Sequence, residues 1–246
     1  MRNVYVGTSG FSYKGWIGKF YPEDLPASQQ LEFYAQYFNS VEINSSFYHL
    51  PRKATYESWK KRTPDDFRFV IKGSRYITQF LQLNNTEDAV EKFFEPAIAL
   101  GKKLEVVLWQ LPPRLKGNTE RLTSFIKVLL KNKVAKKARH AFEFRHSTWF
   151  EENILKVMEK YNCGFVIAHS NRWPKAEHVS ADFIYLRFHG APQLFFSNYS
   201  DEELKDWATK AKKWARGKDV CAFFNNDAGG FAAPNAKKLY ELLTAK

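Results

Sequence analysis

The stretch that decides the fold is HAFEFRHSTW, at residues 140–149. Aromatic and polar side chains alternate along it, as they do in a strand with two different faces. Phe142 and Phe144 share one face, and Glu143 and Arg145 share the other. Rings outside and charges inside are typical of a strand in a closed (β/α)8 barrel, which packs one face on helices and lines the barrel with the other. We expect charges in such a barrel only near its top.

The rest of the chain alternates strand and helix patterns in the same sense. Further strands are predicted for Val4–Gly7, Val41–Asn44, Arg68–Lys72, Leu104–Gln110, Phe165–Ala168, Phe183–Phe188 and Val220–Phe224. Helices are predicted for about Ser28–Phe38, from about Thr55, for Glu87–Leu100, Leu122–Leu130, Phe150–Tyr161, Asp201–Ala215 and Ala233–Leu243, with Ser147 and Thr148 as N-caps of the fifth. The segment Ser170–Asp182 contains Pro174 and little helical period, so we expect a degraded sixth helix. The sequence therefore predicts an α/β fold, with residues 1–246 forming one TIM-barrel domain that has long loops at its C-terminal face.

Composition narrows the class of protein. The 246 residues include 7 Trp, 12 Tyr and 22 Phe, more rings than a core of this size needs, so we expect some of them to serve a site. Cys163 and Cys221 are far apart and lie in or beside apolar runs, which indicates reduced core thiols and a cytoplasmic protein. We expect no N-terminal signal and no membrane partner, because Val4–Val6 already reads as strand and no apolar run approaches the ~18 residues of a span.

The net charge of +12 raises the question of a nucleic-acid partner. Clusters of Lys and Arg fall just before predicted strands, where helices end and cations complement the helix dipole. They are Lys60–Arg62, Lys102–Lys103, Lys131–Arg139 and Lys212–Lys218. In a barrel these ends lie at the bottom, opposite the active-site face, so the pattern favours solvated charge over a nucleic-acid footprint.

Polar side chains also recur at the carboxyl ends of predicted strands. In each strand the apolar set fits the helix layer and the polar set faces the barrel axis, where barrel enzymes place their chemistry. These polar residues are Glu42, Asn44, Lys72, Gln110, Glu143, Arg145, Arg187 and His189. Buried charges need partners, so we expect them to contact one another, water or a ligand.

Motifs along the whole chain carry a family resemblance. They are Gly7-Thr8-Ser9-Gly10 with Tyr13 and Trp16, Phe20-Tyr21-Pro22, residues 41–48 (VEINSSFY), 109–113 (WQLPP), 142–146 (FEFRH) with Trp149, 186–190 (LRFHG), and 224–227 (FNND) with Asn235-Ala236. The set resembles the YecE-like family, the domain-of-unknown-function family 72. That resemblance implies a TIM barrel and brings no settled activity. His169 departs from it, because relatives are expected to carry an acidic residue there.

The strand-end residues predict an anion-binding acid–base site. Glu143 is the candidate general acid/base, because a carboxylate in a closed pocket can be tuned toward neutral pH. Glu42 and Lys72 complete the catalytic set, and Lys72, Arg145 and Arg187 form an anion clamp. Substrate-binding roles are predicted for His189, Asn44, Gln110, Asn225 and Asn226, for Thr8 and Ser9 through the loop after the first strand, and for Trp16 and Tyr48 as aromatic walls.

Structural alternatives apply to the same residues. Glu42 and Lys72 end adjacent strands and can form a structural ion pair, and Glu143 can form a salt bridge to Arg145 or Arg187. Glu143 with His169 and His189 is a thin metal-ligand set, so a divalent metal is possible but not favoured, and the sequence leaves the cofactor unknown. A glycosidase pair of Glu42 and Glu143 is disfavoured because their strands are far apart around the barrel. The remaining residues His49, His140 and His178 are expected at the surface or in loops, and Trp109 in the helix layer.

Three functions remain in view. The leading hypothesis is an enzyme that performs acid–base or hydrolytic chemistry on a polar, anionic small molecule bearing phosphate or carboxylate. A nucleic-acid-binding or nuclease-like barrel is the second, since it would use the net charge. The third is a non-catalytic ligand-binding protein.

Overall fold

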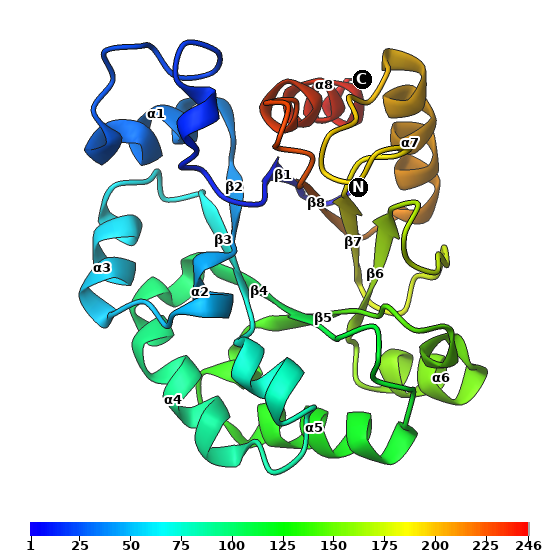
Figure 1. Ribbon diagram of the computed structural model, residues 1–246. Coiled ribbons are helices and arrows are strands. Elements are labelled where there is room, and N and C mark those ends of the chain that lie inside the picture. The colour runs from blue at the N-terminus through cyan, green and yellow to red at the C-terminus, as the bar shows by residue number, and fades with distance from the viewer. Residues whose placement is uncertain (246) are drawn as a thin grey trace.

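Eight strands follow one another around a barrel in the computed structural model, which describes residues 1–245 (Figure 1). They are β1 (Val4–Thr8), β2 (Ser40–Ile43), β3 (Arg68–Lys72), β4 (Leu104–Gln110), β5 (Arg139–Glu143), β6 (Gly164–His169), β7 (Phe183–Phe188) and β8 (Asp219–Phe224). Every hydrogen-bonded pair is parallel, in the order β1-β8-β7-β6-β5-β4-β3-β2. The predicted α/β barrel is confirmed.

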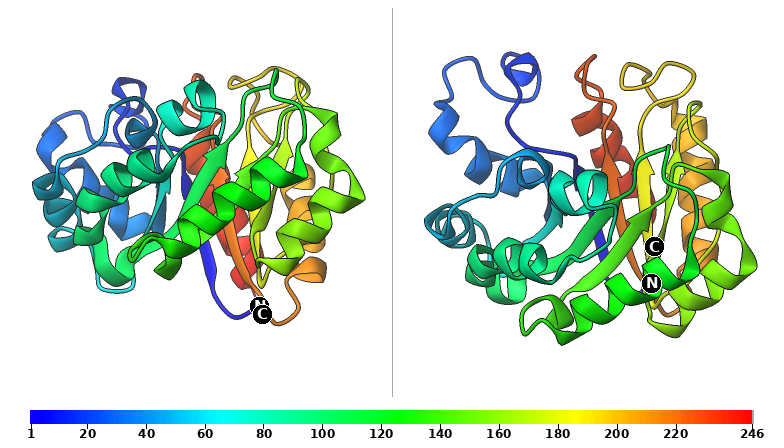
Figure 2. Two further views of the ribbon diagram at one scale, coloured as in Figure 1. Left: turned by 90° about the horizontal axis from the view of Figure 1, so that it is seen from below. Right: turned by 60° about the horizontal axis from the view of Figure 1, so that its bottom comes forward.

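Helices surround this barrel. They are α1 (Gln30–Tyr37), α2 (Ser45–Tyr48), α3 (Lys53–Lys61), α4 (Glu87–Ala97), α5 (Thr119–Lys131), α6 (Glu152–Lys160), α7 (Asp201–Trp214) and α8 (Ala232–Thr244). The connection between β6 and β7 contains no helix, which confirms the degraded sixth helix. Both termini lie at one end of the barrel, and the long loops gather at the opposite, C-terminal end (Figure 2).

Side chains close the barrel between β1 and β2, the two ends of the hydrogen-bonded order. The amide of Asn39 donates to the carbonyl of Val4 at 2.7 Å and accepts from the N–H of Val6 at 3.2 Å. Gly7 has no side chain here because a Cβ atom would lie 2.0 Å from the carbonyl oxygen of Ser40. The seam therefore depends on a close backbone approach and on polar side chains that replace a strand ladder.

The two faces of each strand enter different cores, as the alternation predicted. Phe142, Phe144 and Trp109 belong to the large core between strands and helices. Ala141 belongs to the smaller core inside the barrel, with its neighbour Leu108 on β4. Both cysteines are buried and unpaired, as expected for core thiols.

Charges are not confined to the top of the barrel, contrary to expectation. At the N-terminal end of the strands, Glu105 contacts Arg68 and Arg139, and Arg139 also contacts Asp219 at 2.8 Å. Arg139 covers the ring of Phe183, 4.7 Å from its centroid. These ion pairs close the bottom of the barrel. The charged residues thus lie at the two ends of the strands and not at their centres.

Two local predictions are wrong for identifiable reasons. Ser147 and Thr148 do not cap α6, whose N-cap is Glu151, because Thr148 instead accepts a hydrogen bond from the N–H of Gly117 at 2.7 Å. His140 is not a surface residue: it is 5 % exposed and lies 3.1 Å from the indole N–H of Trp109, which donates to it. Its place in the outward set of β5 indicates this core position.

Most of the basic clusters lie at the C-terminal ends of helices, as the sequence predicted. Lys60 and Lys61 are in the last turn of α3, and Lys212 and Lys213 in the last turn of α7. Lys103 differs, because it is buried and donates to the carbonyls that end α3. Within residues 1–245, each helix is too short or too polar to span a bilayer.

Gly73 provides a test of how tightly the top of β3 packs. A Cβ atom on it would lie 2.2 Å from the ring of Trp109, which is fully buried. We expect Gly73→Ala to lower the free energy of unfolding by about 1–3 kcal/mol through overpacking. Gly15→Ala is the control, because nothing lies within 4 Å of its added Cβ, and we expect a change within about 0.5 kcal/mol. Equal stabilities of the two variants in urea would contradict this packing.

Candidate functional site

Three buried charges meet inside the top of the barrel. Arg187 of β7 donates from Nε and Nη2 to the two carboxylate oxygens of Glu42 on β2, at 2.9 and 2.5 Å. Its Nη1 donates to Oε2 of Glu143 on β5. All three side chains are at most 1 % exposed. One guanidinium therefore joins two carboxylates from strands that are not neighbours, in the forked geometry that Arg favours.

Glu42 has its oxygens fully used within this cluster. The hydroxyl of Ser9 donates to it at 2.7 Å, and the hydroxyl of Tyr185 donates at 2.6 Å. Burial raises the pKa of Glu42, but the charge of Arg187 and these hydrogen bonds outweigh burial and hold the pKa below its usual value. The alternative ion pair between Glu42 and Lys72 does not form, because Arg187 pairs with Glu42 instead.

Glu143 is an ionised carboxylate, not a tuned acid. Arg145 donates from Nε to its Oε1 at 2.8 Å, so both of the expected salt bridges form, to Arg145 and to Arg187. Burial would raise the pKa of Glu143, yet the two guanidinium groups and His189 hold it well below its ordinary value. The expected tuning toward neutral pH is therefore wrong. The reason is that two cations, rather than apolar walls, surround this carboxylate.

Arg145 is held firmly but keeps one edge free. Its Nη2 donates to Oε1 of Gln110 at 2.9 Å, and its guanidinium lies 3.6 Å from the ring centroid of Trp173. Nη1 has no hydrogen-bond partner within residues 1–245, and the side chain is 13 % exposed. This arrangement presents a fixed cation to the mouth of the barrel, with Gln110 and Glu143 setting its orientation.

Lys72 is the unbalanced charge of the site. It is 8 % exposed, and its amine makes no hydrogen bond or ion pair with any residue of the described chain. Nζ lies 4.2 Å from the ring centroid of Phe47. Burial, followed by the charge of Arg187, lowers the pKa of Lys72 to about 7. Because the two carboxylates are already neutralised by two arginines, little remains to hold a proton on this amine.

His189 is a neutral, buried neighbour of Glu143. Its Nε2 lies 3.5 Å from Oε1 of Glu143, and its Nδ1 lies 3.2 Å from the side-chain nitrogen of Asn225. Burial lowers its pKa. The amide of Asn225 can donate only to an unprotonated Nδ1, which puts the proton on Nε2, toward the carboxylate. Trp173 and Phe195 contact the ring at centroid distances of 5.3 and 6.0 Å.

Three further residues with predicted binding roles lie beside the mouth and differ in whether their side chains are already engaged. They are Asn44, Ser9 and Tyr48. The amide of Asn44 donates to the carbonyl of Ser9 at 3.1 Å, and its buried oxygen has no partner in residues 1–245. Ser9 is committed to Glu42. Tyr48 is 58 % exposed. Tyr48 thus remains open to a ligand, whereas the unpartnered oxygen of Asn44 is buried.

Three other predicted binding residues hold loops in place. Trp16 is 1 % exposed, and its indole N–H donates to Asp227 across the loop after β8. Thr8 is fully buried and donates within its own loop. Asn226 donates to Asn235 of α8 at 2.8 Å. Their side chains are thus engaged in contacts that hold the loops in place.

Sequence reasoning missed Trp173, Phe195 and Tyr185. Trp173 and Phe195 lie in the irregular segments after β6 and β7, where no period indicates which way a side chain points. Tyr185 could have been found, because it shares the inward face of β7 with Arg187.

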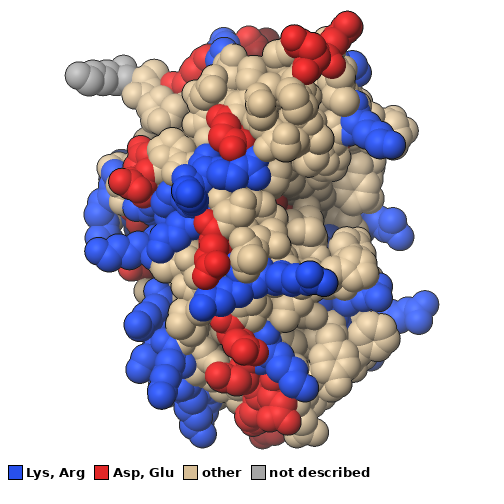
Figure 3. All heavy atoms as spheres, turned by 90° about the vertical axis from the view of Figure 1, so that its left-hand side faces the viewer, with Lys and Arg blue, Asp and Glu red and all other residues tan. Residues whose placement is uncertain are grey.

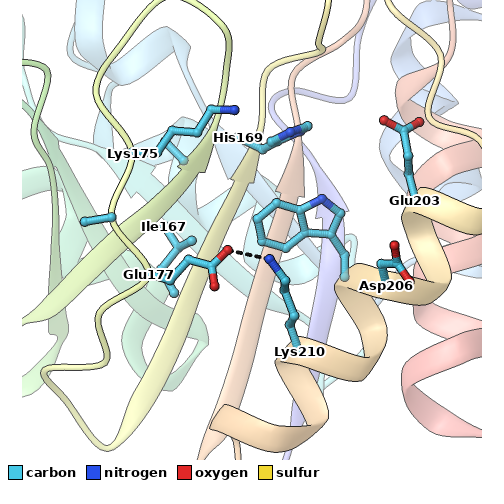
Figure 4. Close-up of a pocket in the computed structure, with 10 residues that line it drawn as sticks. Ile167, His169, Lys175, Glu177, Glu203, Asp206 and Lys210 are labelled. Atoms are coloured by element: carbon cyan, nitrogen blue, oxygen red, sulfur yellow. Dashed lines mark hydrogen bonds and ion pairs between the residues drawn. The ribbon is translucent and has the colours of Figure 1, made fainter.

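His169 lies outside the barrel, in a cavity of about 270 Å3 between the end of β6 and α7. Tyr199 donates to or accepts from its Nδ1 at 3.0 Å, and Trp207 packs on its ring. Figure 4 shows it beside Lys175 and on the side of Glu203 of α7. The disfavoured metal set of Glu143, His169 and His189 therefore does not converge. The reason is strand parity, because Phe165, Ile167 and His169 all lie on the outer face of β6.

Removal of the Arg187 charge tests the cluster. Arg187→Met leaves the buried carboxylate of Glu42 without a cation and leaves Glu143 with Arg145 alone, and we expect a loss of about 3–5 kcal/mol in the free energy of unfolding near pH 7. In the native protein the lowered pKa values of Glu42 and Glu143 stabilise the fold above their ordinary pKa and lose that effect as pH falls. In the variant burial raises the pKa of Glu42, so protonation of this carboxylate relieves the strain, and the deficit should shrink toward about pH 5.

Urea unfolding of both proteins at the two pH values measures this difference. Arg62→Met is the control, because Arg62 and Glu32 form a partly exposed pair and its loss should cost about 1 kcal/mol or less. A deficit for Arg187→Met no larger than the control, or one that widens at low pH, would contradict the description of the cluster.

Comparisons with known proteins agree with this fold. Residues 5–246 match the family model described as "Protein of unknown function DUF72". The UPF0759 protein YunF of Bacillus subtilis is 26 % identical over 98 % of this chain and 94 % of its own, and UPF0759 protein YecE of Escherichia coli is 30 % identical over 44 % of this chain and 38 % of its own. A DUF72 family protein of Thermotoga maritima superposes with a TM-score of 0.84 at 29 % identity, covering 98 % of this chain and 99 % of that one. The chain belongs to the DUF72 family of TIM-barrel proteins.

Proposed function

We propose that this protein is an enzyme that binds a small polar anion at the C-terminal mouth of the barrel and transfers a proton through Lys72. The observation that carries this proposal is that Lys72 is a buried lysine whose amine has no partner within residues 1–245, beside a cluster whose other charges already balance. A lysine with a pKa near 7 can take up and release protons at neutral pH, which an ordinary lysine cannot do. Perturbed groups of this kind concentrate at functional sites.

Each neighbour supports one part of this role. Arg145 offers its free edge to a phosphate or carboxylate. Glu42, Glu143 and Arg187 act as positioning residues, because their hydrogen bonds are spent on one another. Glu143 in particular orients Arg145, and its pairing with two arginines does not suit an acid/base role.

The chemistry follows from the charge balance. Neutral Lys72 accepts a proton from a substrate group or from an attacking water, and it becomes an ammonium ion. That new charge is disfavoured in the unliganded site, but a bound anion compensates it, so proton uptake is easiest when substrate is present. The same ammonium then returns its proton to the leaving group or to the product.

Lys72→Met tests this role. Against a panel of p-nitrophenyl phosphate mono- and diesters and carboxylate esters, we expect any turnover by the native protein to fall by about 100-fold or more. The native kcat/KM should rise with pH up to about 7 and then level off, because the neutral amine is the active form, and the variant should lose this limb.

Lys103→Met is the matched control. Lys103 is also buried with a lowered pKa, but it lies at the other end of the barrel and donates to the backbone of Lys60 and Thr63. Its loss should reduce stability and leave the pH limb in place. Turnover by Lys72→Met equal to that of the native protein would remove Lys72 from the mechanism. Ligand binding without any turnover would instead favour the non-catalytic alternative.

A further inference from the structure

A row of aromatic rings leads outward from Lys72 along the rim of the barrel. Beyond Phe47, which contacts Lys72, the ring of Tyr48 follows at 5.0 Å between centroids. The guanidinium of Arg75 lies 5.9 Å from the ring of Tyr48 and 6.0 Å from that of Phe80. The ring of Tyr76 is 6.4 Å from that of Phe80. We call Tyr48, Arg75, Tyr76 and Phe80 the aromatic shelf.

The rings of the shelf are unusually open to solvent. Tyr48 is 58 % exposed, Tyr76 55 % and Phe80 68 %, and Leu50 beside them is 43 % exposed. Single exposed rings are common on protein surfaces, but several in one row next to a site indicate a surface that is covered when a partner binds.

The backbone holds these rings in place. Tyr76 and Phe80 begin and end one π-helical turn, a form that is frequent at functional sites. The residues between them point inward: Ile77 is fully buried, and the side chain of Gln79 donates to the backbone carbonyl of Gln110 at 3.0 Å. The shelf is thus a fixed surface attached to β4, not a pair of loose loop side chains.

We propose that the aromatic shelf binds single-stranded nucleic acid and guides one of its phosphates to Lys72 and Arg145. Exposed rings suit unpaired bases, because every base has a face that stacks. Arg75 supplies the cation that a backbone phosphate needs, and within residues 1–245 it forms no ion pair. This deepens the proposed function by naming its anion as a nucleic-acid phosphate.

Charge complementarity favours this partner over a neutral sugar, which also stacks on aromatic rings. The cation on the shelf is Arg75, which forms no ion pair within residues 1–245, whereas the basic clusters behind the net charge of +12 lie mainly at the other end of the barrel. On the face over α1 and α3, Asp and Glu side chains are interspersed among the Lys and Arg side chains (Figure 3). No continuous basic stripe is visible on that face, so the shelf itself must provide most of the specificity for single strands.

Fluorescence anisotropy with labelled, 5′-phosphorylated DNA and RNA of about twelve nucleotides tests the inference, since this length spans one ordinary single-strand site. We expect binding at about 50 mM NaCl that weakens steeply by about 200 mM. A duplex of the same sequence should bind more weakly, because its bases are not available for stacking. Xylohexaose should not compete.

Two variants assign the binding to the shelf. The triple change Tyr48→Ala, Tyr76→Ala and Phe80→Ala should weaken single-strand binding at least about tenfold without lowering thermal stability, since all three rings are exposed. Arg75→Ala should weaken binding and reduce the salt slope by about one. Lys133→Ala with Lys137→Ala is the control: it removes more charge, but from the cavity at the bottom of the barrel, and should have little effect.

The outcomes separate this inference from the proposed function. No binding to either single strand, equal binding by the triple variant, or loss of binding only in the Lys133 and Lys137 control would overturn the shelf. Competition by xylohexaose with no salt dependence would overturn it in favour of a sugar. Lys72→Met should keep most of the single-strand affinity while losing turnover. If the shelf does not bind single strands, the effect of Lys72→Met on turnover therefore still tests the proposed function.

Discussion

The structure of the mouth depends on one buried guanidinium that neutralises two carboxylates. Arg187 contacts Glu42 and Glu143 at the top of the barrel, where none of the three side chains is more than 1 % exposed. Desolvation of such charges is costly and is offset only when the geometry satisfies nearly all of their hydrogen bonds. Ser9, Tyr185 and Arg145 supply the remaining ones. The cluster therefore fixes the relative positions of β2, β5 and β7.

Because the cluster neutralises its own charges, it also determines the protonation state of Lys72. Had Glu42 paired with it, the amine would be an ordinary ammonium ion with a structural role. Because Arg187 takes that carboxylate, Lys72 stays alone against the ring of Phe47, and burial lowers its pKa to about 7. Among the basic side chains Lys72, Arg145 and Arg187, the amine of Lys72 is thus the one that pairs with neither carboxylate, which makes Lys72 rather than Glu143 the proposed acid/base. The aromatic shelf extends from the same amine along the rim, which joins the chemistry to a binding surface.

Strand parity predicted the barrel and most of the mouth. Period-two alternation placed Glu42, Glu143 and Arg187 on the inner face at the strand ends, and their contacts confirm that placement. Parity does not show which cation pairs with which carboxylate, since that depends on side-chain reach across the barrel axis. It therefore left the Glu42–Lys72 pair open and assigned Glu143 the wrong protonation behaviour. Loop residues such as Trp173 have no period, so their positions over the mouth required coordinates.

The most direct test is the titration of the Lys72 side chain by NMR, followed through its Cε and Nζ shifts in protein labelled at lysine and assigned with Lys72→Met. If Arg187 balances the two carboxylates and burial leaves the amine unpartnered, Lys72 will titrate with a midpoint at about pH 7. A midpoint near the ordinary lysine value of about 10.4 would contradict the account.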